Sequence, residues 1–487
     1  MFESGIPNLD RILGGGIPEG DVLLIMGPPG SGKTILAFQL AFHVMSSGLN
    51  VIYVSTLSES PARLVKHLQT FSFFDGSQIE KHLFLSNIYP VVKKGVDPTL
   101  DALMSVVKKH EAKLLVIDGL ATIRDIHSES PQLRTFIYEL ATALSALDCT
   151  TIVTSDMITS SSPELTMSDS IIVLGIATEG TRVARTIQPQ KVRGQSPLLG
   201  IHSMTIGPGG ISVYPRIESL TGPSLVGLSS DRLSLGLPEF DLMLSGGLLK
   251  GSVTLIAGAP GTGKTLISLQ FMLEGARRGE KGLLIGFRES PRQLMDKMHS
   301  FGLDLETPVE EGLIKIVHRV PIDLLVDEIF AEMVQEIQTF KPARLVMDSV
   351  AEVEYAITEE RRRRTVMTCV AEFVRAHGAT ALSLRELSQV AGPELDFSDS
   401  PLALLGENLI LLRYVEFRSE LYRILSILKM RDTEHDHTIR QYEITPRGLH
   451  VLSIMESTEG ILSGIAQLPS EMRVKRSGSA PQLMGEK

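Results

Sequence analysis

The sequence predicts an α/β protein made of two tandem domains, each with a mostly parallel β-sheet flanked by helices. A glycine-rich loop follows the apolar run Val22–Met26 and precedes a helix-forming segment, and the same strand, loop and helix pattern returns 231 residues later. Further apolar runs alternate with helical patterns in both halves, which is typical of parallel sheets. A repeat of this length is a whole domain. We therefore expect domains over residues 1–220 and 221–455 and a disordered tail over 456–487.

Both glycine-rich loops match the pattern G-x-x-x-x-G-K-[ST] at every fixed position. Small residues let successive backbone N–H groups curl around phosphates, the lysine reaches the terminal phosphates, and the hydroxyl ligates Mg²⁺. The helix that follows points its partly positive N-terminus at the same phosphates. A plain glycine-rich turn, the alternative, would not need both the strand and the helix. The pattern predicts that ATP and Mg²⁺ bind at Gly27, Pro28, Pro29, Gly30, Ser31, Gly32, Lys33 and Thr34, and again at Gly258, Ala259, Pro260, Gly261, Thr262, Gly263, Lys264 and Thr265.

Length and composition fit two large globular domains. The chain has 487 residues, 43% of them hydrophobic, and a prior of roughly 150 residues per domain allows two or three domains. The net charge is −10 and residues 361–364 form the only dense basic run, which disfavours a protein that coats nucleic acid. No apolar run approaches the roughly 18 residues of a membrane span, and the start of the chain lacks a signal-peptide plan, so we expect a cytoplasmic protein without a membrane segment. Cys149 and Cys369 are expected to be buried, reduced thiols.

The elements of the first half follow in a regular order. The polar, glycine-rich segment 4–20 is expected to frame the nucleotide pocket from outside the sheet. After the loop and its helix, strands are expected at 51–55, 114–118 and 150–156, helices at 61–71, 101–109 and 131–147, and β-rich structure beyond 171. Ser60 and Pro61 fit the N-cap and the first position of the helix at 61–71.

Two acidic residues at strand ends extend the predicted phosphate site. Asp118 ends an apolar strand about 90 residues after the first loop. This Walker B pattern predicts that Asp118 holds Mg²⁺, either with Thr34 or through a water. Glu59 follows the strand at 51–55, at the edge where open α/β sheets place their ligands. Its functional interpretation is polarisation of the water that attacks the γ-phosphate, and a surface charge at a helix start is the alternative.

The second half repeats this order. A strand is expected at 282–286, a second Walker B strand at 345–348, a helix at 362–377, a strand at 379–384 and hairpins over 409–442. Asp348 and Thr265 are the predicted Mg²⁺ ligands, and Glu289 is the predicted counterpart of Glu59. Together with Lys33 and Lys264, the two glutamates form the predicted catalytic set.

Three further motifs accompany the phosphate-binding loops. Both loops are preceded by G-x-P-x-x-D-x-x-L-x-G-G, and the second half contains YVEFR at 414–418 and LKMR at 428–431. In these motifs the sequence resembles the KaiC family of cyanobacterial circadian clock proteins over roughly residues 1–455. The resemblance implies two RecA-like ATPase domains and six chains in a double-layered ring with ATP at the subunit interfaces. It also implies that Lys429 and Arg431, and in the first domain Lys191 and Arg193, contact the phosphates of a neighbouring subunit, where they stabilise charge during phosphoryl transfer.

The chain departs from the family pattern at the predicted catalytic glutamates. KaiC has two adjacent glutamates where this chain has Ser58 before Glu59 and Arg288 before Glu289. One glutamate at a strand end serves RecA-like ATPases in general. The fixed positive charge of Arg288 nevertheless makes turnover at the second site less favourable than at the first.

A second departure concerns self-phosphorylation. KaiC phosphorylates a neighbouring serine and threonine in its second domain, and the matching residues here are Ala403 and Leu404. Neither side chain carries a hydroxyl group that could accept a phosphate. The serine/threonine kinase label of the family is therefore not expected to describe this chain.

Three classes of function remain open from the sequence. The leading one is a ring ATPase whose nucleotide state controls assembly and the binding of unidentified protein partners, because a bound γ-phosphate orders nearby loops. The second is a DNA-acting motor or recombinase of the same fold. The acidic balance and the lack of an aromatic and basic strip count against it. The third is a nucleotide-binding scaffold with little hydrolysis, which the missing glutamates favour.

Overall fold

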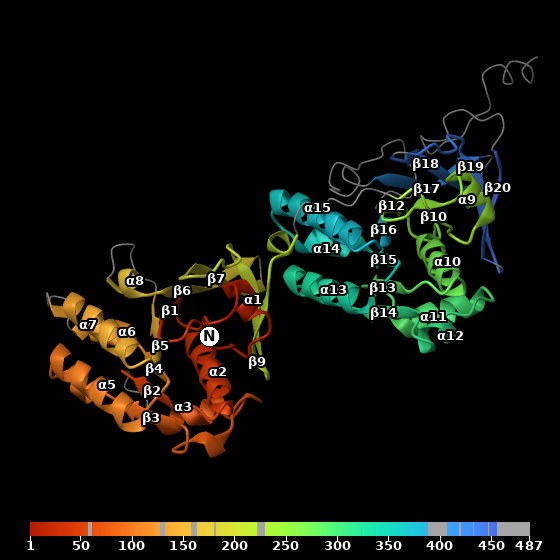
Figure 1. Ribbon diagram of the computed structural model, residues 1–487. Coiled ribbons are helices and arrows are strands. Elements are labelled where there is room, and N and C mark those ends of the chain that lie inside the picture. The colour runs from red at the N-terminus through yellow and green to blue at the C-terminus, as the bar shows by residue number, and fades with distance from the viewer. Residues whose placement is uncertain are drawn as a thin grey trace, which may run out of the picture. The chain divides into compact units, whose positions relative to one another are not determined.

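The structure, a computed structural model, describes residues 1–56, 61–126, 132–156, 163–179, 182–221, 229–322, 324–387, 407–417, 420–431, 433–446 and 448–454. The chain divides into two compact units, Met1–Leu220 and Thr221–Lys487 (Figure 1). None of the described helices combines the length and the apolar character that a membrane crossing requires.

The first unit is built on a nine-stranded sheet in the order β3-β2-β4-β5-β1-β6-β7-β8-β9. Strands from β3 to β6 in this order are parallel, and β6 to β9 form an antiparallel extension. The strands are β1 Val22–Met26, β2 Val51–Ser55, β3 Leu83–Asn87, β4 Leu114–Asp118, β5 Thr150–Ser155, β6 Ser170–Glu179, β7 Arg182–Val192, β8 His202–Gly207 and β9 Gly210–Tyr214. The helices are α1 Leu9–Leu13, α2 Lys33–Ser46, α3 Pro61–Leu68, α4 Tyr89–Val92, α5 Val96–His110, α6 Leu120–Ile126, α7 Gln132–Ala146 and α8 Pro163–Met167, with short 3₁₀ turns at Gly76–Gln78 and Ile217–Ser219.

Alternate residues of the central strand β1 face two separate cores. Leu23 and Ile25 pack in the core that contains α2, whereas Val22 and Leu24 pack in the core that contains α5 and α7. Figure 1 shows α2 on one side of the sheet and α5 and α7 together on the other. Because helices cover both faces, β1 reads as a continuous apolar run and its loop emerges at the carboxyl edge of the sheet.

The second unit repeats this architecture strand by strand. Its main sheet has the order β14-β13-β15-β16-β12-β17-β18-β19-β20, and a separate small sheet pairs β10 with β11. The strands are β10 Arg232–Leu233, β11 Leu248–Leu249, β12 Val253–Gly258, β13 Gly282–Gly286, β14 Ile314–His318, β15 Arg344–Asp348, β16 Thr380–Glu386, β17 Asn408–Phe417, β18 Glu420–Lys429, β19 Arg440–Thr445 and β20 Gly448–Ile454. The helices are α9 Pro238–Met243, α10 Lys264–Arg277, α11 Pro291–Ser300, α12 Glu306–Glu310, α13 Val326–Phe340, α14 Val350–Ala356 and α15 Glu360–Ala376. The structure confirms the predicted pair of RecA-like α/β domains.

Some local expectations differ from the structure. The segment 4–20 contains α1, whose residues Leu9, Ile12 and Leu13 are buried in the core instead of framing the pocket. Their spacing of three and four residues is a helical pattern that the surrounding glycines obscured. The helix expected from residue 101 begins at Val96. Cys149 is buried as predicted, but Cys369 is only partly buried.

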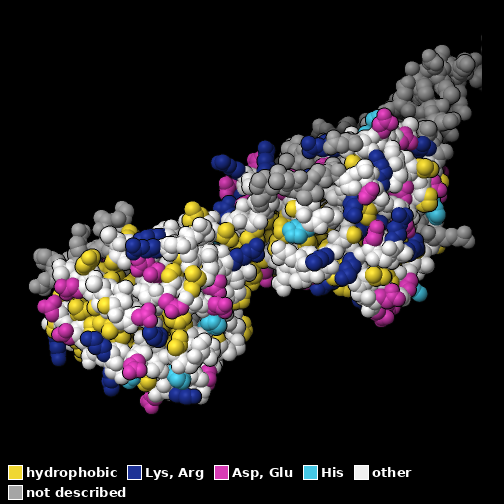
Figure 2. Space-filling view, in the orientation of Figure 1, with side chains coloured by type: hydrophobic (Ala, Val, Ile, Leu, Met, Phe, Trp, Pro, Cys, Tyr) yellow, Lys and Arg dark blue, Asp and Glu magenta, His cyan; other side chains and the backbone are white. Residues whose placement is uncertain are grey.

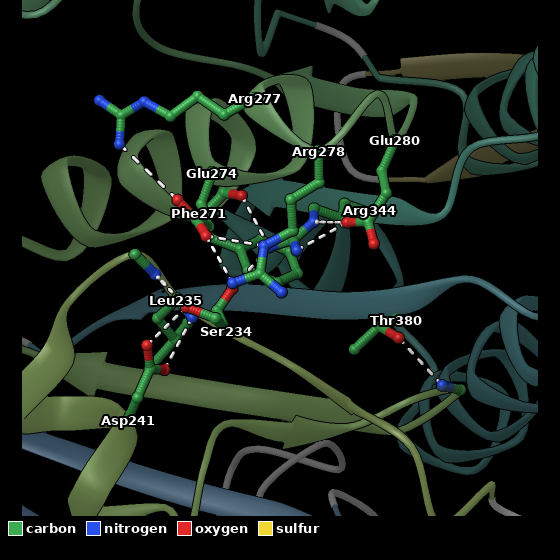
Figure 3. Close-up of polar contacts among 12 residues, drawn as sticks. Ser234, Leu235, Asp241, Phe271, Glu274, Arg277, Arg278, Glu280, Arg344 and Thr380 are labelled. Atoms are coloured by element: carbon green, nitrogen blue, oxygen red, sulfur yellow. Dashed lines mark hydrogen bonds and ion pairs between the residues drawn. The ribbon is translucent and has the colours of Figure 1, made fainter.

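The buried Arg344, on β15, bonds to residues from three other segments of the second unit (Figure 3). Its Nε donates to Glu280 Oε2 at 2.7 Å. Its Nη1 donates to the carbonyl oxygens of Ser234, at 2.7 Å, and Phe271, at 2.9 Å. The guanidinium also lies 4.4 Å from the ring centroid of Phe271. Gly275 on α10 makes room for it, because a Cβ there would lie 2.4 Å from Arg344 Cδ.

Candidate functional site

The first glycine-rich loop connects β1 to α2. Gly30 and Gly32 have φ angles of 78° and 105°, which glycine adopts without strain. Gly32 also lies close to β8, since a Cβ at this position would come within 2.9 Å of Ile206 Cδ1. The loop is therefore curled at the carboxyl edge of the sheet, and α2 begins at Lys33 with its N-terminus directed to the loop.

Lys33 is folded back over this loop. Its Nζ donates to the carbonyl oxygens of Gly27, at 2.6 Å, and Pro28, at 3.2 Å. It also pairs with Asp156, which follows β5, at 3.1 Å. The ammonium group is thus held by oxygen acceptors at the place where the motif puts terminal phosphates.

Asp118 ends β4 and is buried beside the loop. Its Oδ2 accepts hydrogen bonds from Thr34 Oγ1, at 3.0 Å, and from the Tyr53 hydroxyl, and its Oδ1 accepts one from the Thr154 hydroxyl. A carboxylate next to a hydroxyl group offers the hard oxygen ligands that Mg²⁺ prefers. Within the described ranges no group of three His, Cys, Asp or Glu side chains could hold a metal ion. The Thr34 and Asp118 pair therefore fits Mg²⁺ that is also bound to a nucleotide.

A cavity of about 690 Å³ joins these groups, and its lining includes Lys33, Thr34, Asp118 and Asp156. This volume lies within the roughly 300 to 1,000 Å³ that small-molecule sites occupy. The first unit therefore brings the predicted phosphate loop and the Walker B aspartate into one pocket.

The second loop has the same core geometry. Lys264 Nζ donates to the carbonyl oxygens of Gly258, at 2.7 Å, and Ala259, at 2.9 Å. Thr265 Oγ1 donates to Asp348 Oδ2 at 2.8 Å. Burial lowers the pKa of Lys264 and raises the pKa of Asp348, because both charged forms lose hydration. The second pair thus fits Mg²⁺ as the first does.

The residues that follow β13 distinguish the second pocket, a cavity of about 520 Å³. Glu289 Oε2 accepts a hydrogen bond from Lys297 Nζ at 2.6 Å, so its carboxylate is engaged in an ion pair. Arg288 donates from Nε to Glu352 and from Nη1 to Glu386, both at 2.7 Å. All five side chains except Glu352 border the cavity.

Some residues of the predicted sites lie outside the described part of the chain. They are Ser58 and Glu59 in the first domain, and Ala403, Leu404 and Arg418 in the second. The helix after Glu289 begins as predicted for its counterpart after Glu59, since Ser290 caps α11 and forms a capping box with Gln293.

The side chains of Lys191 and Arg193 are directed to the amino end of β1, whereas the loop lies at its carboxyl end. Through β6, Lys191 is level with the middle of β1, and its Nζ donates to the Ser168 carbonyl at 2.7 Å. Arg193 pairs with Asp169 at 2.9 Å. Both side chains are thus held at the amino edge of the sheet, away from the loop of their own domain.

Lys429 and Arg431 have the same placement in the second domain. Lys429 pairs in the ladder with Leu409, near the start of β17, which runs parallel to β12. The backbone N–H of Arg431 donates to Asn408 Oδ1 at 3.3 Å. The structure therefore does not bring either basic pair together with the phosphate loop of the same domain.

Sequence reasoning missed two arginines that contact the tips of the loops. Arg185 Nε donates to the Gly30 carbonyl at 3.3 Å, and Arg423 Nε donates to the Gly261 carbonyl at 3.4 Å. The repeat could have revealed them, because the offset that carries Lys191 to Lys429 also carries Arg185 to Arg423. Other supporting polar residues that were not singled out are Tyr53, Thr154, Asp156, Glu386 and Tyr442.

The basic run at 361–364 lies in the first turn of α15, and two of its four arginines are in ion pairs. Arg362 pairs with the buried Asp327 at 2.6 Å, and Arg364 pairs with Glu360 at 2.6 Å. On the face shown in Figure 2, Lys and Arg are interspersed with Asp and Glu. This arrangement does not favour a surface that binds the phosphate backbone of a nucleic acid.

Comparison with known proteins agrees with this geometry. The model of the KaiC ATPase family matches residues 2–218 and again residues 233–456, one match in each unit. The circadian clock oscillator protein KaiC of Picosynechococcus sp. is 30% identical to this chain, and the match covers 98% of this chain and 94% of that protein. The circadian clock protein KaiC3 of Synechocystis sp. is 31% identical, with 98% of this chain and 96% of that protein covered. The chain therefore belongs to the KaiC family of ATPases.

Proposed function

We propose that the chain binds and hydrolyses ATP with Mg²⁺ in a homohexameric ring, and that its nucleotide state controls the binding of protein partners. One observation carries the assembly: each domain holds a phosphate loop at the carboxyl edge of its sheet, whereas its Lys-x-Arg pair begins level with the middle of the central strand and runs toward the amino edge. Strand β1 has five residues, so its first and last Cα atoms are about 13 Å apart at roughly 3.3 Å per residue. The Lys191 side chain is directed to the amino edge of the sheet, away from its own loop, and is therefore placed to complete a phosphate site in a neighbouring subunit.

The residues of the first pocket divide the work of phosphoryl transfer. Lys33 releases its backbone acceptors and binds the terminal phosphates, while the α2 N-terminus supplies backbone N–H groups. Thr34 and Asp118 hold Mg²⁺, which neutralises charge on the phosphates. Glu59 orients the attacking water. Lys191 and Arg193 of the adjacent subunit stabilise the charge that develops in the transition state.

The two sites are proposed to differ in rate, with most hydrolysis in the first domain. Glu59 has the neutral Ser58 beside it, whereas Glu289 is paired with Lys297 and follows Arg288. Lys33→Ala should therefore remove most of the turnover, and Lys264→Ala should remove the smaller part. The two rates are compared by measuring steady-state phosphate release from the two variants, with the same fraction of chains assembled into rings in each sample. The opposite order would mean that Arg288 is harmless or helpful to catalysis.

Light scattering after size exclusion, with and without Mg-ATP, tests the assembly. The natural chain is expected to form hexamers only with nucleotide, and Lys191→Ala with Arg193→Ala should weaken them. Lys113→Ala is a matched control, since Lys113 is exposed and pairs only with the exposed Asp148 in the described structure. Chains that stay monomeric in saturating Mg-ATP would contradict the proposal.

A nucleotide-binding scaffold with little hydrolysis is the second candidate, because both carboxylate oxygens of Glu289 engage Lys297. Rings that assemble with ATP but release almost no phosphate would favour it. A DNA-acting motor has less support, since Arg362 and Arg364 are already paired with acidic residues. Tight binding of duplex DNA that weakens steeply as the salt concentration rises would support a DNA-acting motor instead.

A further inference from the structure

Arg288 spans the carboxyl ends of neighbouring strands in the second domain. It follows β13, and its two carboxylate partners come from the first turn of α14, after β15, and from the end of β16. These strands are adjacent in the order β13-β15-β16-β12. The guanidinium therefore lies across the sheet edge from which the second phosphate loop emerges.

The partners of Arg288 connect it directly to this loop. Glu386 pairs in the ladder with Gly258, the first residue of the loop. Arg288, Glu386, Lys264 and Asp348 all border the same cavity. Arg288 is also close enough to Lys264 to contribute to the lowering of its pKa, after the larger effect of burial. The arginine is thus part of the phosphate pocket.

The first domain lacks this arrangement. By the repeat, Asp156 matches Glu386, but Asp156 pairs with the loop lysine Lys33. Arg288 is matched by Ser58, and Glu352 is matched by Thr122. In the second domain the carboxylate beside the loop is therefore paired with an added arginine instead of the loop lysine.

Arg288 is about half exposed, so its side chain is accessible to a ligand in the cavity. The Arg288 side chain is 51% exposed, and ion pairs of such exposure contribute little to folding stability. Its Nη2 has no hydrogen-bond partner within the described ranges. Without Arg288, the Glu386 carboxylate would border the cavity without this counter-charge and would repel a terminal phosphate.

We propose that Arg288 binds the γ-phosphate of ATP within its own chain, exchanging Glu386 for the phosphate, and so makes the second site select ATP over ADP. The proposal rests on the proposed function, since it assumes that the second loop binds ATP. A planar guanidinium suits this role because it binds phosphate oxygens through two parallel N–H donors. Glu352 remains bonded to Nε and orients the guanidinium.

Nucleotide affinities of the full chain test the proposal. Lys33→Ala removes the loop lysine of the first site, and binding of AMP-PNP and of ADP, each with Mg²⁺, is measured by calorimetry in this background. Arg288→Gln should weaken AMP-PNP binding by about tenfold to a hundredfold, the range expected for a lost charged hydrogen bond, and ADP binding by less than about twofold. Arg288→Lys should give an intermediate loss. Arg292→Gln, a change in an exposed i,i+4 ion pair on α11, is the matched control and should change neither affinity.

A role in charge neutralisation alone predicts a different result. Adding Glu352→Gln and Glu386→Gln to Arg288→Gln removes the carboxylates, so the triple variant would regain AMP-PNP binding if Arg288 merely neutralised them. The proposal expects the loss to persist. Recovery in the triple variant, or an equal loss for AMP-PNP and ADP in Arg288→Gln, would overturn it. A Lys33→Ala chain that binds neither nucleotide would instead overturn the proposed function of the second site.

Discussion

The buried network of Arg344 leads to a prediction about the stability of the second domain. Arg344→Leu removes hydrogen bonds to two carbonyl groups, each contributing about 1 kcal/mol, and a cation–π contact contributing about 0.5 to 2 kcal/mol. Glu280 is 31% exposed and regains water when its partner is removed. We expect the free energy of unfolding to fall by about 2.5 to 4 kcal/mol.

The milder substitution Glu280→Gln should lower the free energy of unfolding more than Arg344→Leu does. Glu280→Gln keeps the shape of the side chain but leaves the Arg344 guanidinium, which is 0% exposed, without the carboxylate that pairs with it. Burial already lowers the pKa of Arg344, which shows that desolvation opposes its charge more than Glu280 supports it. We expect a loss of about 3 to 5 kcal/mol, the range for breaking a buried ion pair from one side.

The first domain contains the apolar alternative to this network. Its matching residues are Val44, Leu49 and Leu114, where the second domain has Gly275, Glu280 and Arg344. Val44 and Leu114 belong to the core cluster, and the partly buried Leu49 packs against it. The triple variant Gly275→Val, Glu280→Leu and Arg344→Leu should therefore lie within about 1 kcal/mol of the natural chain, since apolar replacements of buried ion pairs are often neutral.

Hydrogen exchange followed by mass spectrometry on the full chain measures these values. Peptides from α10 and β15 report the opening free energy of the second domain, and peptides from α2 and β4 serve as an internal control that should not change. A neutral Glu280→Gln variant would refute the reasoning. A triple variant less stable than Glu280→Gln would refute it as well, because it would show that the network stabilises the fold beyond its charges.

Three further outcomes are expected. Burial raises the pKa of Asp348 above its ordinary 3.8, so the unfolded chain loses this proton first and stability falls as the pH rises from 3.8 to the raised pKa, above which the loss is constant. Asp348→Asn should therefore stabilise the nucleotide-free, Mg²⁺-free second domain near pH 7, and denaturant titrations should show this gain vanishing near pH 3. Burial raises the pKa of Cys149 to about 12, so Ellman's reagent at about pH 8 should modify the partly exposed Cys369 at least tenfold faster, and equal rates would contradict this. Intact-mass measurement after incubation with Mg-ATP should show no stoichiometric self-phosphorylation, whereas one phosphate per chain within 398–412 would show that Ala403 and Leu404 were matched in the wrong register.

The sequence was sufficient for the parts of the site that are local in the chain. The loops and the helices that follow them were predicted because a strand, a loop and a helix within about 20 residues have a strong pattern. The Walker B aspartates were predicted because each ends an apolar strand at the expected distance after a loop. The contact of Thr34 with Asp118, 84 residues apart, followed from the parallel arrangement of β1 and β4 at one sheet edge. Periodicity and spacing thus predict the positions of residues that the order of the strands determines.

Contacts set by individual side chains could not be predicted in this way. Arg288 bonds to residues 64 and 98 positions further along the chain, and no periodic pattern links them. Arg185 and Arg423 lie on antiparallel strands that return to the loops, and their role depends on the register of those strands. The apolar face of α1 was hidden because only five residues are helical between glycine-rich turns.

The opposite placement of phosphate loop and Lys-x-Arg pair in each domain has a consequence for symmetry. If one edge of a subunit supplies the Lys-x-Arg pair and the opposite edge supplies the phosphate loop, the contact between subunits is head to tail. A two-fold dimer then cannot place both edges against a partner. An open row always leaves one loop without a donor and one donor without a loop. A closed ring completes every loop. Hydrolysis per chain should therefore increase abruptly at closure, and a few subunits with a defective donor edge should inactivate only the loops next to them.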